Sequence, residues 1–136
     1  MIFDITKNIG VWFDFPGGGR VQLRAPSVED VMRISKESTE IRPFLFEQEG
    51  KAPRVLNQEI PDLDKQSRLY NDCAILAWEG FFDANETEIP CTAENKTLLM
   101  RLDDPAFRDF VNEKVKALSK ATEAEAAEAE KNSVTG

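Results

Sequence analysis

Residues 78–111 read WEGFFDANETEIPCTAENKTLLMRLDDPAFRDFV, and they decide how this chain folds. The stretch holds three predicted helix boundaries. One helix ends near Gly80, and Thr92 caps the start of the next. The Asp-Asp-Pro sequence at 103–105 ends that helix and begins another, with aspartate at the N-cap and proline at the first helical position. Since none of these side chains forms a catalytic set, the stretch predicts a small packing module that works through its surfaces.

Apolar residues at helical spacing predict four helices along the chain. The first begins at the N-cap Ser27, where Asp30 completes a capping box, and it ends by about Arg42. The second begins at residues 61–62 and continues to Gly80 as the central, most buried helix. From first helix to fourth, the side chains expected to face inward are Val28, Val31, Met32 and Ser35; Leu63, Leu69, Tyr70, Cys73, Ala74, Leu76, Ala77, Trp78 and Phe81; Leu98, Leu99 and Leu102; and Phe107, Phe110, Val111, Val115 and Leu118.

A β-hairpin is predicted before the first helix. Apolar and other residues alternate over residues 9–15 and again over 20–24, and Pro-Gly-Gly-Gly lies between them. Alternation with period 2 on both sides of a Gly-rich turn is typical of a hairpin. The glycines at 17–19 lack a Gly-Lys-Ser/Thr ending and a following helix, so a turn is favoured over a phosphate-binding loop. The inward residues of the hairpin are expected to be Val11, Phe13, Phe15, Val21 and Leu23.

The predicted fold is α+β and mostly α-helical, with the N-terminal β-hairpin packed on about four helices. Residues 1–118 are expected to form a single globular domain. Within it, residues 47–60 show no sustained period and are interpreted as a surface loop with a short extended piece at 54–56. Residues 119–136 form an acidic, Ala/Glu-rich tail, helical or frayed, because alanine is the only apolar residue type between Leu118 and Val134.

Composition limits the classes of partner. The chain has 136 residues, of which 25 are acidic and 17 basic, giving a net charge of −8. A surface of this sign repels phosphate groups, which disfavours nucleic acids and anionic membranes. The longest apolar run, residues 73–78, is much shorter than the roughly 20 residues that a membrane span needs. The N-terminal residues have no long apolar stretch and do not resemble a signal peptide.

The sequence contains no histidine, which argues against an enzyme. Histidine is the commonest general base and metal ligand, and Ser-His and Cys-His arrangements require it. The acidic pairs at 29–30, 103–104 and 86/88 fall at predicted helix caps and exposed loops, where a structural role is favoured over acid–base catalysis. Cys73 and Cys91 form no C-x-x-C pair and are expected to stay reduced. We therefore expect no catalytic residues, no cofactor and no metal.

The loop at residues 83–94 is compared with the calcium-binding EF-hand. Oxygen-bearing side chains occupy positions 1, 3, 5 and 12 of the motif, between two predicted helices. However, Glu88 stands where the motif needs glycine, and Pro90 follows two residues later. An ordinary acidic loop between helices is the favoured interpretation. A small acidic regulatory adaptor, responsive to calcium through this loop, is the alternative function. The matching residues are Asp83, Asn85, Thr87 and Glu94.

Two features are candidates for binding a partner. Phe81 and Phe82 are neighbours at a predicted helix end, where both cannot easily face inward, so one of them is expected on the surface. The acidic tail is either a solvated end or a docking element for a partner or a neighbouring subunit. Its candidate residues are Glu123, Glu125, Glu128 and Glu130.

The order of residues in the deciding stretch resembles the tail assembly chaperones of long-tailed bacteriophages, the lambda-like siphophage family. The resemblance covers roughly residues 65–115, and the hairpin followed by residues 23–27 also fits the way such proteins begin. Where the family often has glycine in the acidic turn, this chain has residues 86–88, Glu-Thr-Glu. The matching positions are Trp78, Gly80, Asp83, Pro90, Glu94, Asn95, Leu98, Leu99, Asp104, Pro105, Ala106 and Phe107.

The resemblance implies a role in tail morphogenesis. Members of the family bind the tape-measure protein and the tail-tube protein before the tube polymerises, in the host cytoplasm, and are absent from the mature virion. Family members often have a longer form made by ribosomal frameshifting, and residues 130–132, Glu-Lys-Asn, could be encoded with the slippery heptamer A-AAA-AAC. Association of the chain with itself is left open by the sequence.

Overall fold

The computed structural model describes residues 10–134, with side chains from residue 10 to residue 121. Over these residues it contains four helices and five strands in two antiparallel sheets. The fold is α+β, but the predicted architecture, mostly helical with one hairpin, is wrong. Strands replace predicted helix or loop in two places, at residues 39–61 and at residues 75–79.

The first sheet has three strands in the order β1-β2-β5, all antiparallel to their neighbours. The predicted N-terminal hairpin is confirmed by the pairing of β1 with β2. Because β2 lies in the middle of this sheet, its inward side chains Val21 and Leu23 are fully buried. The strands are β1 (Val11–Asp14), β2 (Arg20–Leu23) and β5 (Ile75–Glu79).

Strand β5 replaces the last part of the predicted central helix, so that prediction is wrong for residues 75–79. Helix α2 (Leu63–Ala74) ends where the chain can pair with β2, so that Ile75 lies opposite Leu23 and Trp78 opposite Val21. Both Ile75 and Trp78 are buried by this pairing. An apolar run of this length suits a helix or a strand equally well, and the pairing with β2 decides between them.

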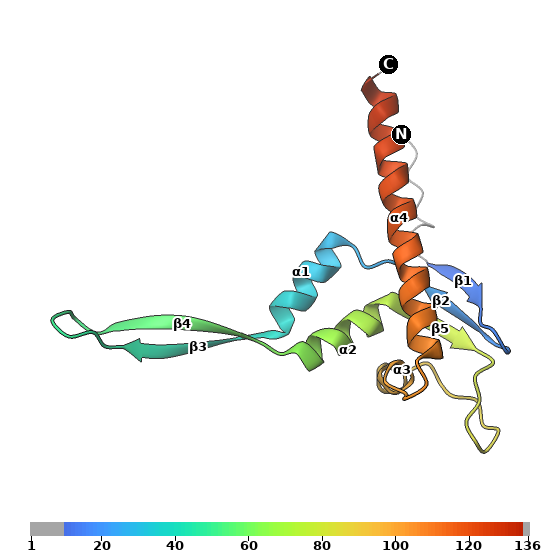
Figure 1. Cartoon of the computed structure of the whole chain (residues 1–136), viewed down its shortest axis with the longest axis horizontal. Helices are drawn as coiled ribbons and strands as arrows, with labels where there is room; N and C mark the ends of the chain where they lie inside the picture. The colour runs from blue at the N-terminus through green and yellow to red at the C-terminus, as the bar shows by residue number, and fades with distance from the viewer. Residues whose placement is uncertain (1–9, 135–136) are drawn as a thin grey trace.

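The second sheet is a long hairpin that projects from the body (Figure 1). It consists of β3 (Thr39–Phe46) and β4 (Arg54–Pro61), paired along their whole lengths. The prediction of a helix to about Arg42 is therefore wrong. Residues 47–53 are a loop as predicted, and the extended piece predicted at 54–56 is the start of a strand that continues to Pro61. Pro43 is tolerated in β3 because each strand of a two-stranded hairpin has one free edge. At such an edge the missing N–H of proline removes no hydrogen bond between the strands.

The predicted helix caps are largely confirmed. Helix α1 (Val28–Glu37) has the capping box between Ser27 and Asp30, and the Asp62 carboxylate accepts from the Lys65 amide at 3.1 Å to cap α2. Thr92 caps α3 (Ala93–Met100). Helix α4 (Ala106–Val134) begins one residue later than predicted, and the Asp104 carboxylate accepts from its first amide at 3.0 Å.

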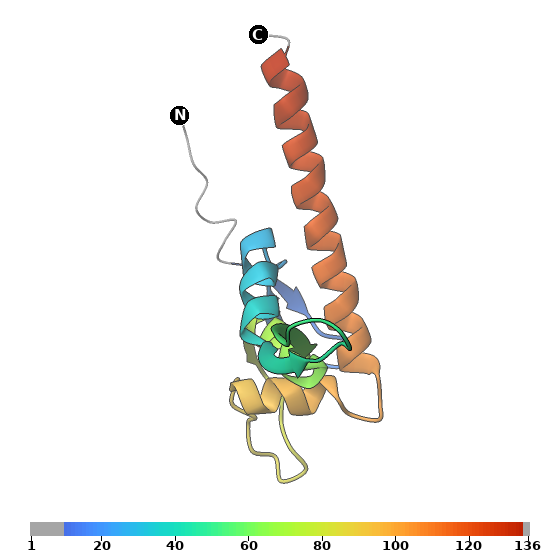
Figure 2. The same cartoon turned by 90° about the vertical axis from the view of Figure 1, so that its left-hand side faces the viewer.

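The core lies where α4 crosses one face of the three-stranded sheet (Figures 1 and 2). The predicted inward face of the last helix is confirmed, because Phe107, Val111 and Val115 are buried and Phe110 and Leu118 pack beside them. Other predictions of inward residues are wrong. The large side chains predicted to face helix interiors but exposed in the structure are Val28, Val31, Met32, Leu63, Tyr70, Leu98 and Leu102.

Arg24, the residue after β2, connects this strand to α1 and α2. Its Nε donates to the Cys73 carbonyl at 3.0 Å, its Nη1 donates to the Asp30 carboxylate at 3.0 Å, and its Nη2 lies 2.9 Å from the Cys73 sulfur. The guanidinium therefore connects the end of β2 to the start of α1 and the end of α2. Hydrogen bonds hold the pKa of Asp30 at about 2, the largest effect coming from the Ser27 backbone amide and smaller ones from the Ser27 hydroxyl and Arg24, while burial opposes them.

The base of the projecting hairpin is fixed to α1. The Ser38 hydroxyl donates to the Ile34 carbonyl at 2.6 Å, and the Ser38 carbonyl accepts from the Asp62 amide at 2.7 Å. Ser38 and Ile34 are both buried. The two ends of the hairpin are thus held together where α1 ends and α2 begins.

We expect Leu23→Ala to lower the free energy of unfolding by about 2–5 kcal/mol, because the substitution leaves a cavity at a fully buried site. Urea unfolding followed by circular dichroism measures the change. Leu63→Ala is the matched control, since Leu63 is exposed and its truncation is expected to cost less than about 0.5 kcal/mol. Equal losses for the two variants would show that the core is elsewhere.

Stability should fall as pH decreases from about 4 to about 2. Because folding lowers the pKa of Asp30 from 3.8 to about 2, its ionised form stabilises the fold above the unfolded-state pKa, and that contribution is lost as pH falls through the folded-state value. Asp30→Asn should flatten the pH dependence of the urea midpoint within this window. The exposed Glu29→Gln is the control, and an unchanged slope in Asp30→Asn would refute the prediction.

Candidate functional site

The projecting hairpin carries apolar side chains on both of its faces. Cross-strand partners share a face, so Phe44 lies beside Leu56 on one side, and Leu45 lies beside Val55 on the other. An isolated two-stranded hairpin is marginally stable in water. Strands that are apolar on both faces are typical of sheets covered on both sides. We name the exposed apolar residues of this hairpin the arm surface; they are Ile41, Phe44, Leu45, Phe46 and Val55.

Helix α1 extends the arm surface toward the body. The side chains of Val28, Val31 and Met32 are 76%, 48% and 67% exposed. No other part of the described chain therefore buries this apolar face of α1. Val31 and Met32 share a shallow surface hollow with Ile41 of β3. The apolar residues of α1 therefore continue the face of the hairpin that carries Ile41 and Leu45. Together with the arm surface we call them the α1–arm surface.

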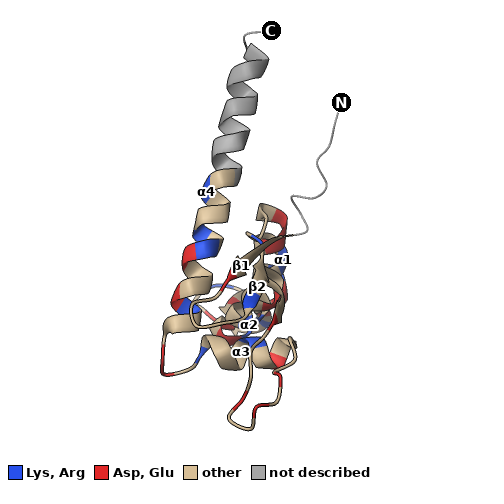
Figure 3. Ribbon diagram, turned by 90° about the vertical axis from the view of Figure 1, so that its right-hand side faces the viewer, with Lys and Arg blue, Asp and Glu red and all other residues tan. Residues whose placement is uncertain are grey.

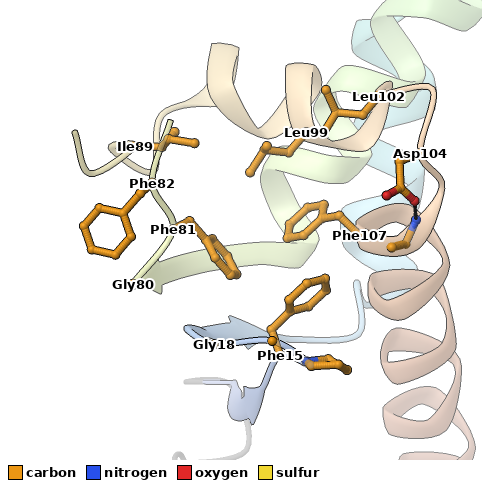
Figure 4. A pocket seen from close by; sticks show the side chains of 13 residues that line it. Phe15, Gly18, Gly80, Phe81, Phe82, Ile89, Leu99, Leu102, Asp104 and Phe107 are labelled. Carbon is orange, nitrogen blue, oxygen red and sulfur yellow. Dashed lines mark hydrogen bonds between the residues drawn. The ribbon is translucent and has the colours of Figure 1, made fainter. Parts of the chain in front are cut away.

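A second apolar surface lies at the other end of the molecule. It is a hollow of about 320 Å³ between the β1–β2 turn, residues 80–82 and the connection from α3 to α4 (Figure 4). We call it the aromatic hollow. The side chains that give it its character are Phe15, Phe81, Phe82, Ile89, Leu102 and Phe107.

The two phenylalanines that the sequence singled out both line the aromatic hollow, in different ways. Phe81 is partly buried, and its ring centroid lies 5.6 Å from that of Phe15 and 5.8 Å from those of Trp78 and Phe107. Phe82 is 60% exposed. The Phe81 ring is thus held in the wall of the hollow by three neighbouring rings, whereas the Phe82 ring is exposed and can contact a binding partner.

The acidic loop beside the hollow is held in shape by hydrogen bonds between its own residues. The Asp83 carboxylate accepts from the amides of Asn85 and Thr87 at 2.8 and 3.0 Å, and the Ile89 amide donates to the Phe81 carbonyl at 2.8 Å. Strand β5, rather than a helix, precedes the loop. The predicted interhelical setting, and with it the helix–loop–helix arrangement of an EF-hand, is therefore wrong. Residues 10–121 contain no group of three or more acidic or cysteine side chains placed to hold a metal ion.

The two cysteines are free, and neither sits in a setting that would activate it. Burial raises the pKa of the Cys73 thiol, in spite of Arg24 nearby. Burial also raises the pKa of the Cys91 thiol. Both are therefore protonated near neutral pH, and the nucleophilic thiolate is scarce.

The α1–arm surface is the candidate site that sequence analysis missed. A signal was present, because Phe-Leu-Phe at 44–46 and Val-Leu at 55–56 stand out in a polar surrounding. The predicted site residues of the tail, Glu123, Glu125, Glu128 and Glu130, lie beyond the residues whose side chains the structure describes.

These observations describe a small α+β protein with two separate apolar surfaces and, within residues 10–121, no grouping that resembles a metal site. Comparison with models of protein families, with curated proteins and with solved structures finds no match to the chain. No helix in the described part of the chain is both long and apolar enough to cross a membrane.

We expect the native protein to bind the dye 8-anilinonaphthalene-1-sulfonate, because the α1–arm surface is a large exposed apolar patch. The double variant Phe44→Ser, Leu45→Ser should lower the dye fluorescence to the share bound at the aromatic hollow, while keeping the unfolding transition of the body. Leu98→Ser is the control, since Leu98 is exposed but belongs to neither apolar surface. Undiminished fluorescence in the double variant would place the dye elsewhere.

Proposed function

We propose that this protein is a non-catalytic assembly chaperone of bacteriophage tails, which binds tape-measure and tail-tube proteins before the tube polymerises. The observation that carries the proposal is the α1–arm surface, where apolar residues of one helix and one hairpin remain exposed together. A chaperone of this kind acts by covering apolar surfaces of subunits that would otherwise associate early. An exposed apolar element is what such cover requires.

The hairpin suits insertion between apolar layers of a client protein. Phe44 and Phe46 would contact one layer, and Leu45 would contact the other, because they alternate along β3. The free edges of β3 and β4 also offer unpaired backbone groups to a strand of the client. Both kinds of contact are available to a subunit whose own strands have not yet assembled.

The expected complex is reversible, which an assembly factor needs. Fully burying a Leu, Val or Phe side chain is worth about 1.5–3 kcal/mol, and those of the arm surface are roughly half covered already. The gross gain from the five residues is therefore on the order of 5 kcal/mol. Association itself costs about 4–15 kcal/mol, so the arm surface alone gives weak binding that polymerisation of the tube can displace.

The sequence resemblance supports the same function from another direction. Its matching positions include buried or packed residues such as Trp78, Leu99 and Phe107, together with helix-start residues such as Asp104. They define the body that carries the arm. In this proposal the protein acts in the host cytoplasm and is absent from the mature virion, and a longer form arises by frameshifting near residues 130–132.

Co-expression and affinity capture test the proposal. The chain should capture the tape-measure protein or the tail-tube protein encoded near its own gene, and Leu45→Asp should abolish capture because it puts a charge into the apolar contact. Leu98→Asp is the matched control, since it makes the same change at an exposed leucine outside the α1–arm surface. Failure of the unmodified chain to capture either protein would sink the proposal.

A further inference from the structure

The aromatic hollow is separate from the α1–arm surface. The hairpin of β3 and β4 projects from one end of the molecule, whereas β2, β5 and the loop after β5 lie at the other end (Figure 1). No residue lining the hollow belongs to α1, β3 or β4. A ligand of the hollow would therefore leave the arm free.

The shape of the hollow is built into the backbone at two glycines. A Cβ on Gly19 would come within 2.8 Å of the Phe81 ring, and a Cβ on Gly80 within 2.8 Å of the Gly19 Cα. Both glycines have positive φ, 79° and 78°, which other residues rarely adopt. Their close approach holds Phe81 against the Phe15 ring. The hollow is thus formed before any ligand arrives.

The size and lining of the hollow fit a side chain better than a cofactor. Its volume of about 320 Å³ is at the small end of ligand pockets, which span about 300–1,000 Å³. The lining is apolar except for backbone atoms and one carboxylate, that of Asp104. Phe82 and Leu102 are exposed beside it, at 60% and 47%. They lie at opposite ends of the hollow, with the Phe81 and Phe107 rings between them (Figure 4), so one large apolar side chain would fill the space between the two.

The loop after β5 and the connection from α3 to α4, which border the hollow, both carry acidic residues, red in Figure 3. Asp83 and Glu88 lie on the loop that carries Phe82, and Asp103 and Asp104 lie on the connection that carries Leu102. None of these four carboxylates has a lysine or arginine within ion-pair distance among the described residues. Two cations are close in the sequence: Arg101, which pairs with Asp64 at 2.6 Å, and Arg108 on the first turn of α4. Acidic groups therefore stand on both sides of the apolar opening.

We propose that the aromatic hollow is a docking site for a cationic segment of another protein. One phenylalanine or leucine of the segment inserts beside the Phe81 and Phe107 rings, with Phe82 and Leu102 on opposite sides of it. Lysine or arginine residues on either side of it face the acidic loops. The combination gives an apolar anchor that supplies affinity and a charge pattern that selects the partner. This site goes beyond the proposed chaperone function and does not depend on it.

Charge also favours a different protein over a second copy of this chain. The apolar tip of the hairpin is followed by Glu47 and Glu49. Insertion of that tip into the hollow would bring these acids toward Asp103 and Asp104, and like charges in contact are unfavourable. Arg54 stacks over the Phe46 ring, with its guanidinium carbon 5.7 Å from the centroid, so part of the positive charge at the tip is already engaged.

Trp78 provides a reporter of occupancy, because its ring lies 5.8 Å from Phe81 and 6.0 Å from Phe107, both in the wall of the hollow. Trp12→Phe leaves Trp78 as the single tryptophan of the chain. The probe is a synthetic peptide with one phenylalanine between two pairs of lysines. We expect a saturable change in Trp78 emission on titration, with an affinity that falls as salt is added.

Paired variants in the Trp12→Phe background test the two parts of the site. Leu102→Ser should weaken peptide binding about tenfold, as loss of an interface anchor does, while Leu98→Ser leaves it unchanged. Asp103→Lys should weaken binding by a similar factor, about tenfold, while Glu113→Lys, which changes net charge equally on α4, has little effect. Thermal unfolding of each variant checks that the fold is retained.

Three results would overturn the proposal. In the first, peptides with alanine in place of phenylalanine, or glutamate in place of lysine, bind as well as the probe. In the second, Leu102→Ser and Leu98→Ser bind the probe equally. In the third, sedimentation shows an oligomer of the unmodified chain that both Leu102→Ser and Phe44→Ser dissociate, which would make the arm of a second copy the occupant. None of these measurements uses a phage tail protein, so they stand apart from the test of the chaperone function.

Discussion

The placement of α1 beside the end of α2 depends on the contacts of one guanidinium, that of Arg24. It is the residue that follows the central strand β2, and its hydrogen bonds reach the Asp30 carboxylate on α1 and the Cys73 carbonyl at the end of α2. The two helices are therefore held against each other and against the sheet. Since the hairpin leaves α1 at its C-terminus and enters α2 at its N-terminus, the α1–α2 pair sets its direction. Loss of this junction would free the start of α1 from the end of α2, whereas the bond from the Asp62 amide to the Ser38 carbonyl would still close the base of the arm.

The molecule divides its apolar residues between two tasks. Those of β2, β5 and the first turns of α4 are buried together and stabilise the body. Those of α1 and the hairpin remain in contact with water at a cost in free energy, since each buried side chain of their kind would contribute about 1.5–3 kcal/mol. A net charge of −8 counteracts the association that such exposure invites. Exposure of this extent is therefore better explained by a partner than by folding.

Short sequence patterns predicted the helix caps correctly, but they did not predict strands β3, β4 and β5. The caps at Ser27, Asp62 and Thr92 follow from contacts within three residues, so a short pattern contains them. The hairpin of β3 and β4 was missed because apolar residues on both faces remove the period-2 alternation that marks a strand. Strand β5 was missed because only β2, more than fifty residues away, turns an apolar run into a strand. For the site, the sequence identified Phe81 and Phe82 but not the arm, since exposure of an apolar face is a property of the tertiary structure.

The two apolar surfaces differ in how firmly they are formed, and this difference assigns them different kinds of recognition. Rings and two glycines fix the aromatic hollow on several sides, so a ligand that fits gains affinity without the cost of ordering the site. The arm is held at its base by Ser38 and Asp62, and beyond that point only by its own cross-strand pairs. A preformed hollow discriminates between side chains, whereas a hairpin fixed at one end can adjust to surfaces of different shape. A protein with both could bind one segment selectively while the arm covers whatever apolar surface lies near that segment.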